Sequence, residues 1–570
     1  MTLIRSNYFY VLSILLVTYG CLTTSHSDVY QSLLDKQLTG EELGRMKFLY
    51  SDMGGISPHT LKSNGFVYKM AIVALSTVVN DKANNNAHKS IKNPDSLFAN
   101  YGFVYATQIL NNSFNQELIA QNALQNVLSE APQYKRATGL VFGKIEGFHP
   151  TKGKFVVEVA DLGCGACHGG PVYGKDGYPT TTFAAGMPNA SLNLDALSHD
   201  LLRGYQNIVN WNEKQFANEL IKLFPDTKKE ELIGLNLFFK ALKKEINKIT
   251  ATRKEPAPYK IGGVGTLNGI GAIKSNLNMI SKASYNGDIG ALVSIPTLAN
   301  RNFKSSLLVS GNYAPVNKEF FYEINKKDTS VKSNNDLAPI ISLFTIGTMG
   351  FSAKMAANAN NDAKDIMAFI ATMEVPPFPA IINGEKAELG RIVFQNNCQS
   401  CHGKYEGTAT RNKLVSFPNK LIPAAKIGTD SIRSQAITHK DLETLTKLPQ
   451  KKYVQAQTHN GYVAPILSGI WATAPYFHNA SIPTLWHLMH PNERPNKFYS
   501  GGHLLDYDKV GIKGELVNGV YQYNKKDKNW SNYEVFDTDK RGASNKGHEK
   551  QFAQLTELEK EQLIEFLKTL

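Results

Sequence analysis

Two short segments of the chain hold the residues best suited to chemistry, Cys164-Gly-Ala-Cys167-His168 and Cys398-Gln-Ser-Cys401-His402. This spacing lets two thiolates reach the two vinyl groups of one porphyrin, while the next imidazole becomes the proximal ligand of the iron. Two Cys-x-x-Cys pairs are also compatible with a zinc site or two redox dithiols. However, His accounts for only 14 of 570 residues, so its place directly after both pairs would arise by chance about once in 1,600 sequences. The sequence therefore predicts two covalently attached c-type haems.

The composition bounds the class of protein. A length of 570 residues predicts more than one domain, and 42% hydrophobic with 19% charged residues is typical of a globular chain. The formal net charge is +13 and the sequence pI is about 9.1. A basic face is suited to docking an acidic electron-donor protein, whereas scattered Lys residues without a compact run argue against nucleic-acid binding.

The first 25 residues are expected to be an export signal. Arg5 precedes the apolar run 8–17, which has the length of a secretory signal rather than of a membrane span. Cleavage near Ser25 is one interpretation, and lipidation of Cys21 after Gly20 is the other. Both routes predict a periplasmic or secreted protein, with membrane attachment only if Cys21 is lipidated.

The elements around the first haem site are expected to differ from those around the second. Residues 26–135 are expected to form an N-terminal helical region, and residues 140–148 and 154–159 a β-hairpin that leads straight into Cys164. The Gly-, Pro- and Thr-rich stretch 169–190 is expected to be a loop lining one haem face. An amphipathic helical stretch, 212–249, is interrupted at Pro225.

The C-terminal third has the elements of a small cytochrome core. A short helix around Gly390 leads into Cys398, and Thr556 with Glu559 forms a capping box ahead of a final apolar helix. The predicted fold class is mainly α, with cytochrome c-like haem domains, long loops and minor β-hairpins. The first haem domain is placed at 136–382 and the second at 383–570, with a large insert from about 404 to 550.

The segment 461–485, which contains Gly461-Tyr-Val-Ala-Pro465 and Tyr476-Phe477-His478-Asn479, carries a family resemblance. Together with the two haem sites, it resembles the bacterial dihaem cytochrome c peroxidase superfamily, in particular the branch with the latex-degrading rubber oxygenases. The resemblance covers roughly residues 160–570 and implies that His168 and His402 are the proximal ligands. Gly547-His548-Glu549 resembles the element that supplies the second axial ligand of the C-terminal haem, so His548 is expected there, with His490 or Met489 as competitors.

The resemblance also implies two further sites. The carbonyls of Thr473 and Pro475 match positions that hold a calcium ion between the haems, but Ser294 replaces the asparagine that completes this site, which weakens the case for calcium. His478 lies in Tyr-Phe-His-Asn near the expected haem edge. It is the candidate catalytic residue, as a proton relay or as support for a ligand, and the alternative is a hydrogen-bonded structural histidine.

Two haems in one chain suggest a division of labour. One iron would keep an exchangeable position for an oxygen ligand, while the other, with both axial positions filled, stores or relays an electron. By family analogy haem 1 is reactive and haem 2 transfers electrons; Met187 and His199 are the nearest alternatives for a distal ligand at haem 1. The favoured function is a peroxidase that takes electrons from a small cytochrome or cupredoxin. The alternatives are a dioxygenase that cleaves an alkene with dioxygen, and a dihaem electron carrier that is not an enzyme.

Overall fold

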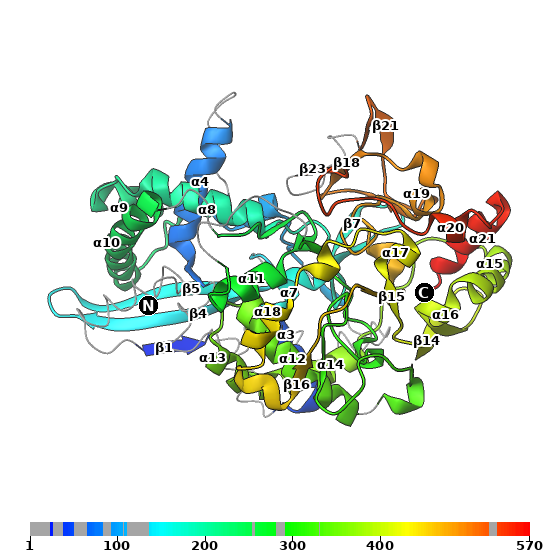
Figure 1. Cartoon of the computed structure of the whole chain (residues 1–570). Helices are drawn as coiled ribbons and strands as arrows, with labels where there is room; N and C mark the ends of the chain where they lie inside the picture. The colour runs from blue at the N-terminus through cyan, green and yellow to red at the C-terminus, as the bar shows by residue number, and fades with distance from the viewer. Residues whose placement is uncertain are drawn as a thin grey trace.

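The computed structural model of the chain describes residues 23–26, 38–50, 65–83, 93–106, 108–110, 136–252, 257–280, 291–329, 331–523 and 533–570. The molecule is elongated in the view of Figure 1, with a long β-ribbon and a helical layer at one end. The last helices of the chain lie at the other end. The two Cys-x-x-Cys-His segments are therefore embedded in different surroundings.

The long ribbon is formed by β4 (Leu140–His149) and β5 (Gly153–Leu162), which pair along their whole length from Leu140↔Leu162 to His149↔Gly153. Gly153 has a φ of 87° at the turn, a conformation that favours glycine. The predicted hairpin is confirmed. Two short strands complete the sheet in the order β1-β4-β5-β2, with β1 at Thr23–His26 and β2 at Phe66–Val67. Strand β1 spans the predicted cleavage point at Ser25, while Cys21 lies outside the described residues.

A layer of helices covers this ribbon. Its elements are α4 (Tyr68–Ala83), η2 (Pro94–Tyr101), α8 (Leu194–Ile208), α9 (Glu213–Leu223) and α10 (Lys229–Thr252). The interruption expected at Pro225 is confirmed, since α9 ends before it and α10 begins after it. Gly234 of α10 lets the helix lie directly on β5, because a Cβ there would lie 2.3 Å from Val157. This face buries Phe155 and Phe238 completely.

The stretch after the first haem site is not the predicted loop. It forms a second hairpin, β6 (Gly169–Tyr173) and β7 (Pro179–Ala185), and β7 also pairs in parallel with β3 (Gln108–Leu110). Glycine at 169 permits this packing, because a Cβ there would lie 1.8 Å from the Phe183 ring. The Gly and Thr content that suggested a loop instead allows close strand packing.

The middle of the molecule joins the N-terminal region to later helices. Helix α3 (Gly40–Tyr50) packs on α14 (Asn360–Thr372), and Lys47 Nζ lies 2.6 Å from Asp362 and 2.5 Å from Asp365. The other elements here are β8 (Gly262–Gly263), β9 (Thr266–Leu267), α11 (Gly269–Asn276), β10 (Val293–Ser294), η5 (Arg301–Phe303), β11 (Tyr313–Pro315), β12 (Ile324–Asn325), η6 (Lys326–Asp328), α12 (Val331–Thr348) and α13 (Ala353–Asn358). The described residues of the predicted N-terminal region thus share their cores with later parts of the chain.

The C-terminal end contains the helix pair expected of a cytochrome core. Helix α15 (Gly384–Asn397) crosses α21 (Glu557–Leu567) at Gly390, where a Cβ would lie only 1.9 Å from the Gln562 carbonyl oxygen. Phe394 packs on Phe566 beside this crossing, with ring centroids 5.1 Å apart. The predicted capping box is present, with Thr556 and Glu559 closing the first turn of α21.

The insert between these helices contains many short strands. Its elements are α16 (Gln399–His402), β13 (Lys404–Gly407), β14 (Asn412–Phe417), β15 (Leu421–Pro423), α17 (Ala424–Ile427), η7 (Arg433–Gln435), α18 (His439–Leu445), η8 (Pro449–Lys452), β16 (Val454–Ala456), β17 (Gly461–Val463), η9 (Ile470–Ala472), α19 (Leu485–Met489), η10 (Pro491–Glu493), β18 (Lys497–Ser500), β19 (Leu505–Asp506), β20 (Gly511–Ile512), β21 (Glu515–Val517), β22 (Val520–Gln522), β23 (Glu534–Asp537) and α20 (Glu549–Phe552). The largest sheet here has the order β21-β22-β18-β23.

The predicted fold class of mainly α is wrong. Helix accounts for 42% and strand for 20%, with the strands spread over many small sheets. The physical reason is that short strands of two to four residues carry too weak a periodic pattern to distinguish them from loops.

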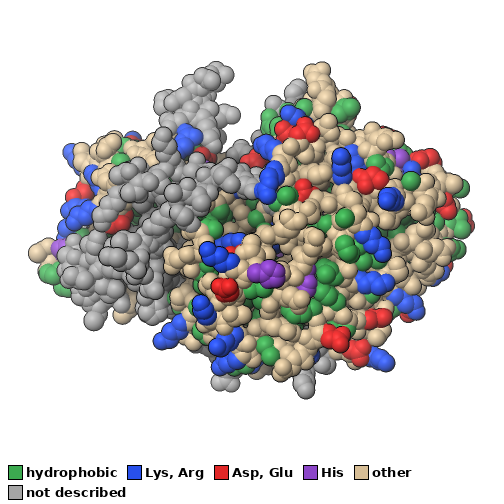
Figure 2. All heavy atoms as spheres, viewed as in Figure 1, with side chains coloured by type: hydrophobic (Ala, Val, Ile, Leu, Met, Phe, Trp, Pro, Cys, Tyr) green, Lys and Arg blue, Asp and Glu red, His purple; other side chains and the backbone are tan. Residues whose placement is uncertain are grey.

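Among the described residues, the helices are all too short or too polar to cross a membrane. Figure 2 shows basic side chains spread among acidic and neutral ones on one face, rather than gathered into a single patch.

Candidate haem sites

The second attachment site follows directly from the end of α15. Cys398 is the C-cap of that helix, and the single turn α16 then presents Cys401 and His402. The His402 Nδ1 atom lies 3.0 Å from the Pro465 carbonyl oxygen, the geometry of an Nδ1–H donor that leaves Nε2 as the metal-binding atom. Burial lowers the pKa of His402, so the imidazole is kept neutral, as a metal ligand must be.

The first site is built on a strand rather than a helix. Strand β5 runs into the turn α7 (Cys164–Cys167), and His168 follows as its C-cap. The His168 Nδ1 atom lies 3.1 Å from the Pro296 carbonyl oxygen, which orients the ring as at the second site. Burial, with a smaller contribution from the positive charge of Arg301, lowers the pKa of His168 to about 4.

The two carbonyls that orient these histidines were not predicted from the sequence. Pro296 and Pro465 occupy matching contexts, Ile-Pro-Thr-Leu and Ala-Pro-Ile-Leu, each on a segment that follows its own Cys-x-x-Cys-His in the chain. This pattern alone could not have found them, because the exact repeat of Ser294–Leu298 is Ser481–Leu485, whereas the carbonyl at His402 belongs to Pro465. Each proximal histidine is therefore oriented by the carbonyl of a proline that follows its attachment motif in the chain.

A second imidazole faces His402. The rings of His402 and His548 have centroids 6.3 Å apart and planes inclined by 36°. This separation leaves room for one metal ion between two imidazole nitrogens at bond lengths of about 2 Å. Burial lowers the pKa of His548 to about 4, and its Nδ1 is buried with no partner in the described part of the chain. The structure thus brings together the two histidines that the resemblance assigned to haem 2.

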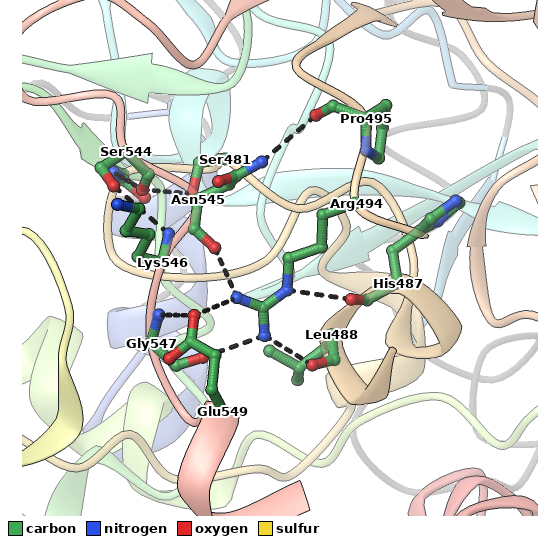
Figure 3. A network of polar contacts seen from close by, with 11 residues as sticks. Ser481, His487, Leu488, Arg494, Pro495, Ser544, Asn545, Lys546, Gly547 and Glu549 are labelled. Carbon is green, nitrogen blue, oxygen red and sulfur yellow. Dashed lines mark hydrogen bonds and ion pairs between the residues drawn. The ribbon is translucent and has the colours of Figure 1, made fainter. Parts of the chain in front are cut away.

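A buried arginine holds the backbone that presents His548 (Figure 3). Arg494, whose side chain is 3% exposed, donates to the carbonyls of Leu488 and Gly547 at 2.7 and 2.9 Å and to Glu549 Oε1 at 2.8 Å. Further donations reach the carbonyls of His487 and Asn545. These contacts define the Arg494 clamp, which was not foreseen from the sequence.

The clamp has a specific conformational task. His548 has a φ of 65°, in the left-handed region that side chains other than glycine rarely adopt. The Gly547 N–H donates to Glu549 Oε1 at 2.7 Å, and the His548 N–H donates to the Ile427 carbonyl at 3.0 Å. Hydrogen bonds on both sides therefore compensate for the backbone strain, and the ring is turned toward His402.

The competitors for haem 2 are occupied elsewhere. His490 stacks on Trp486 with ring centroids 3.8 Å apart. Its Nδ1 lies 2.8 Å from the Trp486 carbonyl oxygen and its Nε2 lies 2.7 Å from Glu557, so both ring nitrogens are engaged. Met489 is buried in the core formed by α15, α21 and the insert.

The first site differs from the second in what faces its proximal histidine. Within the described residues, no second imidazole ring packs against that of His168 in the way that His548 faces His402. Met187 lies beside the Pro296 segment, where its Sδ is 3.8 Å from Thr297 Oγ1. His199 lies on α8, with its side chain 37% exposed and its Nε2 3.8 Å from Asp195. Neither alternative ligand shows the facing arrangement found at the second site.

His478 lies between the elements of the two sites. Its carbonyl accepts from the Ser294 N–H at 2.8 Å, two residues before Pro296, and its neighbour Phe477 stacks on His548 with centroids 5.8 Å apart. The His478 ring stacks on Tyr462 at 4.1 Å. Burial and the positive charge of Arg433 lower the pKa of His478 to about 3, so the ring stays neutral and is suited to hydrogen bonding rather than to holding a proton.

The residues present fit covalent haem. The four motif cysteines form no disulfide, and His168 and His402 are partly accessible, so both motifs are available to a covalently attached group. The described residues contain no cluster of three or more His, Cys, Asp or Glu side chains that would hold a bare metal ion. The Ser294 hydroxyl at the expected calcium position donates to the Phe477 carbonyl at 3.2 Å, and calcium stays a prediction.

Comparison with known proteins places a cytochrome segment in the insert. Residues 461–499 match the family described as "RoxA-like, cytochrome c-like". Among curated proteins, the uncharacterized protein y4iM of Sinorhizobium fredii is 31% identical over 166 residues, covering 26% of this chain and 38% of the relative. The uncharacterized protein y4iJ of the same organism is 27% identical over 218 residues, covering 30% of this chain and 34% of the relative.

The matches support a limited statement. The aligned part spans little more than a third of each curated relative, and the family match covers a small part of the chain. The family match at residues 461–499 nevertheless contains His478 and the Pro465 carbonyl that orients His402. Residues 461–499 are thus similar to the cytochrome c-like domain of the RoxA-like type, and such a domain implies covalently bound haem.

Proposed function

We propose that the chain is an exported dihaem enzyme that reduces hydrogen peroxide to water at haem 1, with electrons relayed through haem 2. One observation carries the proposal: the two attachment sites are unequal. His402 faces the imidazole of His548 at 6.3 Å between centroids, whereas no described imidazole faces His168. An iron with two strong protein ligands exchanges electrons with little rearrangement, while an iron with one can accept an oxygen ligand.

The residues of this chain would hold the two groups in distinct ways. Cys164 and Cys167 would attach haem 1 and Cys398 and Cys401 haem 2, with His168 and His402 as proximal ligands. When bound, the haems supply redox chemistry and an open coordination position. The carbonyls of Pro296 and Pro465 fix the tautomer and orientation of the proximal rings. The Arg494 clamp keeps His548 directed at His402.

His478 is proposed as a residue that supports the haem pockets and not as a proton carrier. Its low pKa, caused by burial and Arg433, means that it remains neutral at pH 7. A neutral ring with a buried Nε2 that has no described partner can still accept or donate one hydrogen bond to a ligand or a water molecule. The proton-relay role of His478 stays a prediction beside this hydrogen-bonding one.

The reaction needs two electrons and two protons for each peroxide. A small cytochrome or cupredoxin would supply the electrons, and the net charge of +13 favours a donor with an acidic docking surface. Export to the periplasm or beyond is part of the proposal, since covalent haem attachment takes place there.

The test is ligand binding followed by turnover. Cyanide should change the absorption and EPR spectra of one haem and leave the low-spin haem unchanged, and peroxide should be consumed when a reduced small cytochrome is supplied under anaerobic conditions. If neither ligand alters either haem, in the oxidised or in the half-reduced protein, both irons are capped and the chain is an electron carrier.

A second function is favoured by the family match. Since residues 461–499 are RoxA-like, an oxygenase that cleaves an alkene with dioxygen is the alternative. Incubation of the protein with polyisoprene latex under air, without an electron donor, separates the two. Carbonyl-terminated cleavage products without donor-dependent peroxide consumption would select the oxygenase.

A further inference from the structure

One segment connects the two attachment sites and carries two cations without an acidic partner. It runs from Pro296 to Lys304. Pro296 provides the carbonyl that orients His168, and the Lys304 Nζ donates to the Ala464 carbonyl at 3.3 Å. Ala464 precedes Pro465, the residue that orients His402. The segment therefore touches the proximal side of both sites.

Arg301 and Lys304 are the two cations of this segment. The Arg301 guanidinium donates from Nε and Nη2 to the Thr297 carbonyl, at 3.0 and 2.7 Å, and so closes on its own segment. Lys304 is 8% exposed, and its Nζ lies 4.5 Å from the centre of the Phe417 ring. Across the described residues, neither cation has an Asp or Glu within ion-pair distance.

The two cations are also close enough to repel each other. Burial lowers the pKa of Lys304 well below its usual value, and the charge of Arg301 lowers it further. Buried charges are normally paired, because an unpaired charge loses its hydration without compensation. Two like charges, with Lys304 buried and Arg301 partly buried, are therefore arranged for anions that the described residues do not supply.

We propose that Arg301 and Lys304 bind carboxylate groups of the two haems, Arg301 those of haem 1 and Lys304 those of haem 2. The assignment follows from position, since Arg301 lies on the segment whose Pro296 carbonyl orients His168, while Lys304 contacts Ala464, next to the Pro465 that orients His402. Haem brings two propionates into each site, so the missing anions would arrive with the cofactor. The inference rests on the two haems of the proposed function but not on the reaction that they perform.

This pairing should affect the reduction potentials of the two haems. A positive charge beside a haem stabilises the reduced form, which has one more negative charge, and so raises the reduction potential. One short segment would then set the potentials of both haems. A change at Arg301 should act mainly on haem 1, and a change at Lys304 mainly on haem 2.

The experiment compares Arg301→Met and Lys304→Met with the wild-type holoprotein by potentiometric titration and resonance Raman spectroscopy. We expect each variant to favour the oxidised form of its own haem about tenfold, which is about 59 mV for a one-electron couple. We also expect the propionate bending bands of that haem to shift. Lys274→Met is the matched control, because Lys274 is a largely buried cation that already has Asp441 at 2.6 Å.

Conservative variants keep the test valid if the Met variants do not fold. Arg301→Lys and Lys304→Arg retain the charge, so potentials should stay near those of the wild type while the propionate bands shift. Unchanged bands in all four variants, with two haems bound, would overturn this inference and leave the proposed function intact. A wild-type protein without haem would overturn both.

Discussion

At the scale of single residues, the left-handed conformation of His548 is the feature on which the second haem site depends. A non-glycine residue in this region costs on the order of 1–3 kcal/mol unless its surroundings hold it. Arg494 provides that support through carbonyls on both sides of the loop and through Glu549. The ligand and its support are therefore separate residues with separable effects.

We predict that Arg494→Gln weakens the attachment of His548 to its site without removing the haem. Loss of the clamp leaves several carbonyls unpaired, so part of the protein should change from low-spin to high-spin at that iron, and added imidazole should reverse the change. EPR and absorption spectra measure this. His548→Ala should give a complete conversion, and Arg391→Gln, at the exposed pair with Glu388 on α15, serves as the control. A fully low-spin Arg494→Gln protein would contradict the positioning role.

A second prediction concerns acid stability. Because burial lowers the pKa of His478 to about 3, the folded state resists protonation that the unfolded chain accepts below about 6.5. Above about pH 6.5 the ring is neutral in both the folded and the unfolded state, so it does not change the free energy of unfolding with pH. As the pH falls from about 6.5 toward 3, only the unfolded state takes up the proton, and the free energy of unfolding decreases. His478→Phe keeps a ring against Tyr462. The variant should therefore lose less unfolding free energy than the wild type on acidification, by a few kcal/mol.

Urea unfolding at pH 7 and pH 4 measures the difference. His439→Phe at the start of α18 is the matched comparison, because it makes the same substitution at an exposed position. An identical pH dependence in wild type and His478→Phe would show that His478 is not held neutral by the fold.

At the scale of elements, the crossing of α15 and α21 determines whether the C-terminal haem site can form. The two helices approach so closely that the backbone of α21 occupies the place of a side chain at Gly390. Cys398 caps the same α15, so any displacement of this helix moves the attachment site as well.

We predict that Gly390→Val separates the two helices and destabilises the C-terminal part by several kcal/mol, because a Cβ would lie 1.9 Å from the Gln562 carbonyl oxygen. Thermal unfolding and haem content measure the effect. Gly269→Ala is the control, since a Cβ there meets nothing within 4 Å. Normal stability in Gly390→Val would mean that the crossing adjusts without cost.

At the scale of the whole molecule, the two candidate haem sites are held by different structural elements. The first is held by the strand β5 and the hairpin β6–β7, and the second by the helix pair α15 and α21. The segment Pro296–Lys304 links them. A haem lost from one site should therefore affect the other through this segment and through the core that Tyr173 of β6 shares with α15 and α21.

We predict two haems per chain in the wild type, and one in each of Cys164→Ala and Cys398→Ala, by the pyridine haemochrome assay. Loss of the second haem should also lower the unfolding free energy of the C-terminal part, since the haem fills space between helices. Ser400→Ala, within the second motif but not a ligand, is the control. One haem or none in the wild type would contradict the dihaem interpretation.

The sequence by itself determined the chemistry, because covalent haem attachment needs a local pattern of Cys and His that no fold can replace. It also predicted the β4–β5 hairpin, the helices on either side of Pro225 and the capped α21, since these depend on local periodicity and caps. Only the tertiary structure showed the facing of His402 and His548, the carbonyls of Pro296 and Pro465, the Arg494 clamp and the unpaired cations at 301 and 304. These features join residues distant in the chain, and they arise from backbone geometry and burial, which leave no periodic signal in the sequence.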